Sequence, residues 1–232
     1  MSHAILPSII DNINSPRQAT IAPLTIVDQI AEELTERILI GVVAQGTRLR
    51  QDAIAYEFSV SQAPVREAFR KLEMRRLVEN IPRKGVRVTL VNADGEREIA
   101  AMRAVLEPLA LLSIKGRLTP PQLADIRSAL QAGDTAQDIY GSEAANRAFH
   151  TALAKPSAMP HLIASIADLN LSYSRHVFAS QRAANWRARS NLDHGRIYEA
   201  VAMGQYEQAA QYLSAHIRAV DRVSFRVRQN AG

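Results

Sequence analysis

From residue 25 onward, apolar residues of this 232-residue chain recur mainly at helical spacing, and one stretch shows a different, alternating pattern. In residues 77–81 and 86–91 apolar and polar side chains alternate, and the segment PRKG at 82–85 separates the two runs. Alternation around a glycine-containing turn is typical of a β-hairpin, whereas a period near 3.6 residues indicates amphipathic helices. The pattern therefore predicts a mainly α-helical protein with one hairpin that separates two groups of helices.

The helices before the hairpin are short and closely spaced. The first is expected to begin at the N-cap Thr25 and to stop at Gly41. A second covers residues 51–58, and a third covers residues 62–76 with Ser61 as its N-cap. Three helices followed by a hairpin, with a short turn between the second and third helix, predict a winged helix-turn-helix.

The chain is thus expected to have three parts. Residues 1–24 form a polar, flexible leader, and residues 25–91 form the winged helix-turn-helix. Residues 92–232 have only helical periodicity and predict an all-helical bundle of six or seven helices. Its predicted helices, separated by stop signals such as Gly116, Gly133 and Gly204, are residues 94–115, 120–132, 135–154, 160–179, 189–203 and 206–228.

Positive charge is concentrated beside the hairpin. Residues 62–91 contain eight basic and three acidic side chains, a difference that accounts for the whole net charge of +5. A solvated basic surface is the simple interpretation, but concentration in one short segment is what a polyanion-binding face requires. This segment therefore predicts contact with nucleic acid.

The third predicted helix should lie in the major groove, with its N-terminal residues facing base edges. Arginine pairs bidentately with guanine and glutamine with adenine, so Arg66 and Gln62 are the best candidates for reading bases. Arg50 and Arg70 suit phosphates, and the glycine at the wing tip lets the hairpin approach the duplex closely. The predicted DNA-binding residues are Arg50, Ser61, Gln62, Ala63, Pro64, Arg66, Arg70, Lys84 and Gly85.

These segments also resemble a known family. The matching stretches are VSQAPVREAFRKLE at 60–73, LV at 77–78 and RKGVRV at 83–88. They resemble the DNA-binding signature of the GntR family of bacterial regulators, which implies a homodimer on a pseudo-palindromic operator in double-stranded DNA. The family usually has arginine where this chain has Gln62, and often arginine where it has Asp52. The loss of two cations alters the expected operator sequence, and Arg50 is the residue that could compensate.

Three histidines face inward on three different predicted helices of the second region. Their apolar neighbours on the same faces are Phe149 and Leu153 for His150, Ile197 and Val201 for His194, and Leu213, Ile217 and Val220 for His216. Asn146 precedes His150 by one helical turn on the same face. Leaving such groups buried without a shared partner costs about 1–3 kcal/mol each. The residues alone leave open separate hydrogen-bonded histidines or a site for a divalent metal such as Zn²⁺, Ni²⁺ or Mn²⁺.

Residues 94–226 resemble the FCD effector domain of the FadR-type branch of GntR regulators. The matching features are Arg103, Leu106 and Glu107 for the pattern R-x-x-L-E, NRAFH at 146–150 for D-x-x-F-H, and the spacing of His194, Ala200 and His216. Many FCD domains hold a divalent metal with an aspartate and three histidines, and the metal helps to bind an organic acid. The resemblance therefore implies a metal site, with zinc expected first, at Asn146, His150, His194 and His216. Asn146 in place of the aspartate should weaken metal binding and favour an anionic ligand, and six helices point to the VanR-like subgroup.

A small organic acid inside the bundle requires a cationic partner, and arginine suits a carboxylate. Arg103 on the first bundle helix and Arg175 close to Tyr173 are the candidate effector-binding residues. Each arginine could instead pair with a local glutamate or with a helix end. The expected regulator is a repressor, in which ligand at the metal moves the helical domains and changes the separation of the two DNA-binding heads.

Two other functions fit part of the sequence. A metal-dependent hydrolase also uses three histidines with open metal positions, but no acidic residue is expected at the site as a general base. Glu143 and Asp193 are near the histidines in sequence and are expected to lie off the faces that carry them. An architectural DNA-binding protein with a purely structural bundle is the third alternative, and metal in the purified protein would argue against it.

Composition excludes several classes. The chain has no cysteine, so disulfides and thiolate zinc sites are excluded, and aromatic residues make up only 5%, which argues against a stacking platform for single strands. No apolar run approaches the roughly 20 residues that cross a bilayer, and the N-terminus lacks the pattern of a signal peptide. These features predict a cytoplasmic protein with no membrane partner.

Overall fold

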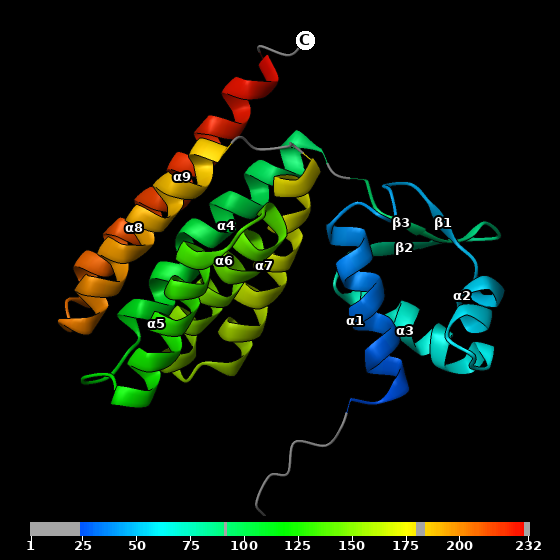
Figure 1. Cartoon of the computed structure of the whole chain (residues 1–232), viewed down its shortest axis with the longest axis horizontal. Coiled ribbons are helices and arrows are strands. Elements are labelled where there is room, and N and C mark those ends of the chain that lie inside the picture. Colours follow the sequence, from blue (N-terminus) through cyan, green and yellow to red (C-terminus); the bar gives the residue numbers. More distant parts are fainter. Residues whose placement is uncertain (1–23, 91, 180–183, 230–232) are drawn as a thin grey trace, which may run out of the picture.

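The computed structural model describes residues 24–90, 92–179 and 184–229, which form two lobes (Figure 1). The N-terminal lobe consists of α1 (Ile26–Leu39), β1 (Arg48–Leu49), α2 (Gln51–Glu57), α3 (Gln62–Met74), β2 (Val78–Ile81) and β3 (Gly85–Val88). The C-terminal lobe consists of α4 (Ala93–Leu112), α5 (Pro120–Thr135), α6 (Ile139–Ala154), a short 3-10 turn (Lys155–Ser157), α7 (Pro160–Ala179), α8 (Ala184–Ala202) and α9 (Tyr206–Gln229). The predicted leader lies almost entirely outside the described residues.

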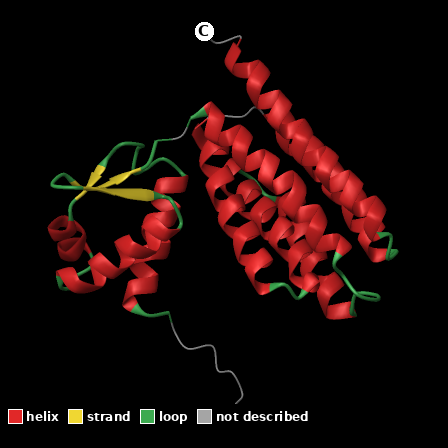
Figure 2. Ribbon diagram, turned by 180° about the vertical axis from the view of Figure 1, so that it is seen from behind, coloured by secondary structure: helices red, strands yellow, loops and turns green. Residues whose placement is uncertain are grey.

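The N-terminal lobe is a winged helix-turn-helix, as the hairpin pattern predicted. Figure 2 shows that the strands are confined to this lobe. The sheet has the order β1-β3-β2 with antiparallel pairing, so the hairpin β2–β3 forms the wing and β1 adds a third strand. Sequence analysis missed β1 because a strand of only two residues, Arg48–Leu49, is too short for alternation to be recognised.

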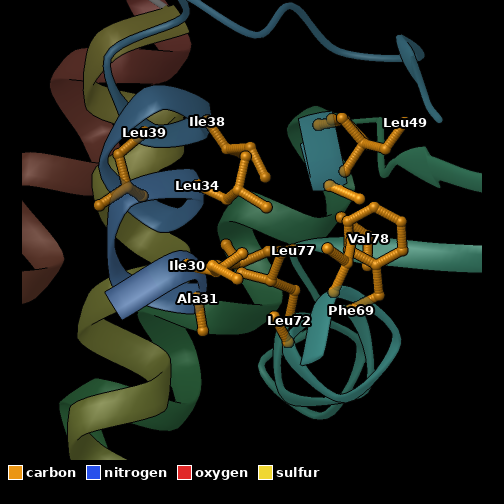
Figure 3. Packing of buried hydrophobic residues seen from close by; sticks show 14 residues of the cluster. Ile30, Ala31, Leu34, Ile38, Leu39, Leu49, Phe69, Leu72, Leu77 and Val78 are labelled. Carbon is orange, nitrogen blue, oxygen red and sulfur yellow. The ribbon is translucent and has the colours of Figure 1, made fainter. Parts of the chain in front are cut away.

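The core of this lobe explains why its three helices fold around the sheet. Thr25 caps α1 by accepting a hydrogen bond from the backbone N–H of Asp28, as expected. Figure 3 shows Ile30 and Leu34 of α1 pointing toward Leu72 and Leu77. Leu72 belongs to α3, and Leu77 lies directly before β2. All four of these apolar side chains are fully buried. The buried face of α3 therefore fixes which side of that helix remains exposed.

The C-terminal lobe contains six α-helices within the described residues, and the mainly helical fold is confirmed. Several predicted boundaries were wrong, including the end of α4, which is Leu112 rather than Lys115, and the start of α8, which is Ala184 rather than Arg189. Gly133 does not end its helix, because α5 continues to Thr135, and the next helix begins at Ile139 rather than at Thr135. The reason is local: Asp138 accepts a hydrogen bond from the backbone N–H of Gly141 and so caps α6, and this later cap competes successfully with the earlier stop signal.

Helix α4 is central to the C-terminal lobe, where it contacts α6, α7 and α9, and α8 packs alongside α9 (Figure 1). Helix α7 also faces the N-terminal lobe. Its side chains Leu171 and Phe178 pack against the core cluster of the winged helix, and Arg147 of α6 forms an ion pair with Glu36 of α1 at 3.3 Å. The two lobes therefore share a direct interface, and α7 supplies most of its contacts from the helical side.

Candidate metal centre and nucleic-acid interface

The exposed side of α3 carries the predicted base-reading residues. Val65, Ala68, Phe69 and Leu72 are buried, which leaves Gln62, Arg66 and Arg70, spaced four residues apart, exposed on the opposite side. Ser61 occupies the N-cap position but makes no side-chain capping hydrogen bond. Ala63 is exposed and Pro64 is half-buried in the first turn, where the missing N–H of proline is tolerated. The structure thus brings the predicted α3 residues to one accessible face.

Ion pairs separate the basic residues of this lobe into two groups. Arg70 pairs with Glu67 at 2.6 Å, and Arg50 pairs with Asp52 at 2.6 Å. Within the described residues, Arg66 and Lys84 have no acidic partner within 4.0 Å. The two arginines predicted to bind phosphates are therefore already paired, whereas the predicted base reader and the wing lysine are available to a polyanion.

The wing tip has the backbone that a tight turn requires. Arg83 and Gly85 have positive φ angles of 64° and 81°, and Lys84 donates its backbone N–H to Ile81 at 2.9 Å. A residue with a side chain is strained at the φ of Gly85, so glycine is needed at the first position of β3. The turn holds Lys84 at the end of the hairpin.

Three histidines converge in the C-terminal lobe. His150 of α6, His194 of α8 and His216 of α9 are all buried, and one ring nitrogen from each lies within 4.8 Å of the others. Their ring centroids are 4.8–5.6 Å apart. Helical spacing with apolar neighbours places each ring on the inner face of its helix. The packing of α6, α8 and α9 then brings the three rings together.

The Nδ1 and Nε2 atoms of these rings have different neighbours. His150 Nδ1 lies 2.5 Å from Glu107 Oε2, and His216 Nδ1 lies 3.2 Å from Asp193 Oδ2. On the other side, His194 Nε2 lies 3.2 Å from His216 Nε2, and the buried His150 Nε2 has no hydrogen-bond partner. A carboxylate that accepts a hydrogen bond from Nδ1 fixes the tautomer in which Nδ1 carries the proton and Nε2 carries the lone pair. Among the described residues, His150 Nε2 is therefore left with an unused lone pair beside the hydrogen-bonded Nε2 atoms of His194 and His216.

Burial keeps the rings of His150 and His194 neutral. Burial lowers the pKa of His150 to about 4, although the neighbouring Glu107 opposes that change. Burial, together with His216 and His150, holds the pKa of His194 well below its ordinary value. Burial alone would raise the pKa of Glu107, but Arg103 and His150 outweigh it and lower the pKa to about 2. Neutral imidazoles beside an ionised carboxylate are the protonation states that a metal site requires.

Asn146, the fourth predicted ligand, is buried one turn before His150 on α6. Its amide nitrogen lies 3.4 Å from both carboxylate oxygens of Glu143, whose pKa is raised by burial. Glu143 also accepts a hydrogen bond from Ser174 Oγ at 2.7 Å. The expectation that Glu143 and Asp193 lie off the histidine faces was wrong, because Glu143 is fully buried against Asn146 and Asp193 contacts His216 across the α8–α9 pair.

The three predicted effector residues separate into two places. Arg103 is buried on α4, donates from Nε to Glu107 at 2.7 Å, and lies over the ring of Tyr173 with its guanidinium carbon 4.5 Å from the centroid. Through Glu107, these two residues adjoin His150. Arg175 lies elsewhere, because its guanidinium donates to the side chain and the backbone carbonyl of Thr89, at 2.6 and 2.5 Å. The structure therefore does not bring Arg175 to the histidines.

Sequence reasoning missed several contributors. Asn170 donates to Glu107 at 3.4 Å and Ser174 donates to Glu143, so two polar residues of α7 support the carboxylates around the histidines. Helical spacing would place Asn170 and Ser174 on one face, four residues apart, but nothing in the sequence indicates which helix they meet. Asp193 likewise contacts a histidine on another helix, and such pairing follows only from the fold.

A winged helix-turn-helix joined to a helical domain with a buried polar site defines the class of the protein: a DNA-binding regulator with an effector domain. Residues 26–88 match the model of the bacterial regulatory proteins of the gntR family, and residues 98–219 match the FCD domain. The chain therefore belongs to the GntR family of bacterial transcription regulators and carries an FCD domain.

Individual relatives agree with this membership. The uncharacterized HTH-type transcriptional regulator YdhC of Bacillus subtilis (strain 168) is 29% identical over 197 residues, which cover 81% of this chain and 86% of YdhC. The gluconate operon transcriptional repressor of the same organism is 38% identical over 79 residues, 34% of this chain and 32% of that repressor. The solved structure of E. coli McbR/YncC shares the fold, with a TM-score of 0.76 and 23% identity over 88% of this chain and 99% of that chain. Among the described helices, none combines the length and apolar character that a membrane span needs.

Proposed function

We propose that this regulator is a metal-dependent repressor whose DNA affinity changes when a small organic acid binds in its helical domain. The observation that carries the proposal is the cluster of the buried His150, His194 and His216, in which one ring nitrogen of each lies within 4.8 Å of the others. The repressor role is supported by the similarity of 79 residues of this chain to the gluconate operon transcriptional repressor. Chromosomal DNA as the target implies a cytoplasmic location.

The residues fit a divalent metal. Among the described residues, the buried His150 Nε2 has no hydrogen-bond partner, and His194 Nε2 lies 3.2 Å from His216 Nε2. A cation bound by the lone pair of His150 Nε2 removes the cost of leaving that atom unpaired. Three imidazoles suit zinc first, and nickel and manganese are also compatible, with the amide oxygen of Asn146 as the proposed fourth donor. A bound ion would supply positive charge for an anionic ligand.

Arg103 is the proposed anchor for the acid. It is buried beside the histidine cluster, and only its Nε is used by Glu107. The terminal nitrogens of this guanidinium have no hydrogen-bond partner among the described residues, so they can pair bidentately with a carboxylate. Tyr173 stacks against the guanidinium and holds its plane. A small organic acid therefore suits this site better than a neutral or cationic ligand.

Helix α7 is the proposed link between the acid site and DNA. Asn170, Tyr173 and Ser174 contact Glu107, Arg103 and Glu143 around the histidines. The next residue, Arg175, donates to Thr89 at the end of the wing and, at 3.4 Å, to the backbone carbonyl of Arg76 just after α3. A displacement of α7 at the acid site thus acts on the segment that positions the recognition helix and the wing.

We propose that the regulator acts as a homodimer on a pseudo-palindromic operator, and α4 offers a surface for a second copy. Four apolar side chains at steps of three and four residues are exposed on one side of this helix: Met102, Val105, Leu109 and Leu112. An apolar stripe of this length on one face marks an interaction site more often than bare surface. A two-fold axis across α4 would bury the same residues from both copies and orient two DNA-binding heads symmetrically.

The arrangement of the carboxylates favours ligand binding over hydrolysis. Among the described residues, Glu107 and Asp193 engage the Nδ1 atoms of His150 and His216 and so orient the rings, and Glu143 accepts hydrogen bonds from Asn146 and Ser174. A hydrolase needs a carboxylate on the open side of the metal to activate water. We therefore propose a sensory site and no enzymatic activity.

DNA binding is tested by electrophoretic mobility shift with the DNA immediately upstream of the regulator's own gene. Wild-type protein should shift this fragment in the presence of competitor DNA, and Arg66→Glu should abolish the shift. Glu67→Gln, which adjusts charge at a neighbouring α3 position without adding repulsion, is the matched control and should retain binding. An Arg66→Glu protein that binds as tightly as wild type would contradict the proposal.

A further inference from the structure

An open hollow of about 470 Å³ lies between the wing and the start of the helix-turn-helix. It is lined by residues of four elements: β1, α2, the N-terminus of α3 and the first residues of β3. The predicted base reader Gln62 and the wing glycine Gly85 are both at its border. The hollow thus adjoins the two elements that are proposed to contact the duplex.

Arg48 projects into this region from β1. Its strand neighbour Leu49 is buried and contributes to the core, so the alternation of a strand turns Arg48 to the opposite, exposed side. A Cβ built on Gly85 would lie 3.6 Å from both Nε and Nη2 of Arg48. The guanidinium therefore rests against the bare backbone of the wing turn, where no side chain covers it.

The charges around the hollow make Arg48 the cation that is available there. Arg50 is bound twice by Asp52, at 2.6 and 3.2 Å, so its charge is already matched. Gln62 is neutral and Asp52 is acidic, so neither adds positive charge to the hollow. Within the described part of the chain, Arg48 has neither an ion pair nor a hydrogen-bond partner for its guanidinium.

We propose that Arg48 is a DNA-contacting residue that binds a backbone phosphate at the junction of the wing and the recognition helix. This inference rests on the proposed binding of duplex DNA and adds a residue that the sequence patterns did not indicate. Arg48 supplies, from β1, positive charge to a hollow that the neutral Gln62 and the acidic Asp52 also line. An arginine fork pairs well with phosphate oxygens, and the position against Gly85 orders the side chain before DNA arrives.

The test measures fluorescence anisotropy of a labelled 30-base-pair duplex of arbitrary sequence, titrated with full-length protein at a series of KCl concentrations. Each phosphate contact contributes about 0.9 to the slope of log affinity against log salt concentration. Arg48→Ala should therefore reduce the slope by about 0.9 and weaken binding at low salt. Arg48→Lys should retain most of the slope, because a lysine keeps the charge.

Arg117→Ala is the matched control, since it removes one exposed positive charge from the loop between α4 and α5. It should leave the slope unchanged, and thermal melts of all variants should agree with wild type. If wild type binds the duplex and Arg48→Ala has the same slope as Arg117→Ala, the role of Arg48 is overturned while DNA binding stands. If wild type does not bind any duplex, both the proposed function and this inference are overturned.

Discussion

Arg175 of the helical domain donates hydrogen bonds from both terminal nitrogens to a single residue of the DNA-binding lobe, Thr89. Thr89 Oγ1 in turn donates to the backbone carbonyls of Arg76 and Leu77, at 2.9 and 3.2 Å, where α3 ends and β2 approaches. Arg175 is 8% exposed, and burial lowers its pKa to about 10, which leaves it charged at neutral pH. One buried cation thus links α7 to the segment between α3 and the wing.

Arg175→Ala should remove the contact with Thr89 and have two measurable effects. The carbonyl of Thr89 loses the hydrogen bond from Arg175, so the free energy of unfolding should fall by about 1–3 kcal/mol in chemical denaturation. The DNA affinity should also respond less to ligands of the helical domain. Arg175→Lys keeps the charge but loses the forked guanidinium, so its stability and its DNA response should lie between those of wild type and Arg175→Ala. A wild-type response of DNA affinity in the alanine variant would contradict the coupling through α7.

The histidine cluster should bind zinc stoichiometrically. After treatment with a chelator, Zn²⁺ at about 100 times its dissociation constant should stabilise wild type by about 2.7 kcal/mol, because it binds only the folded state. Differential scanning fluorimetry with Zn²⁺ alone should detect this increase, and His194→Ala should lack it. The exposed His161 on α7 gives the control, since His161→Ala removes a histidine outside the cluster. Equal stabilisation of both variants would exclude the site.

Glu107 should set the metal affinity without itself being a ligand. Its carboxylate bonds His150 Nδ1 at 2.5 Å and Arg103 Nε at 2.7 Å, so it orients both the ring and the proposed acid anchor. Glu107→Gln should reduce zinc affinity by about 10–100-fold, as measured by competition with a chromophoric chelator. Glu207→Gln, at the exposed start of α9, is the control and should leave the affinity unchanged.

A charge on the α4 stripe should separate the proposed dimer. Leu109 is 43% exposed on this helix, so Leu109→Glu should not disturb the core of the lobe. Sedimentation equilibrium should find wild type as a dimer and Leu109→Glu as a monomer. Leu192→Glu, at a residue that is 71% exposed on α8, is the control and should remain dimeric. A dimeric Leu109→Glu protein would place the interface elsewhere.

The sequence predicted the fold well because its signals were local. Alternation over a few residues identified the hairpin, Thr25 was recognised as a cap, and helical periodicity placed the inward-facing histidines on their faces. Helix boundaries were predicted less accurately where two local signals competed, as between α5 and α6. Gly133 is compatible with a helix interior, so the cap at Asp138 and not the glycine determined where α6 begins.

The parts of the site that sequence could not provide depend on contacts between elements. Whether Arg175 faces the histidines or the other lobe depends on the rotation of α7 between its two neighbours, and both sides offer polar partners. The pairing of Asp193 with His216 requires the register of α8 against α9. Arg48 was overlooked because its strand has only two residues and its proximity to Gly85 arises from sheet pairing.

The central claim is that occupancy of the histidine site controls DNA binding. It is tested most directly by the anisotropy of a labelled fragment from upstream of the regulator's gene, with chelator-treated protein to which Zn²⁺ and then a panel of lactate, succinate and citrate are added. The account predicts that wild-type affinity falls when zinc and an acid are both present, and that His194→Ala does not respond. The same response in both proteins, or none in wild type, would contradict it.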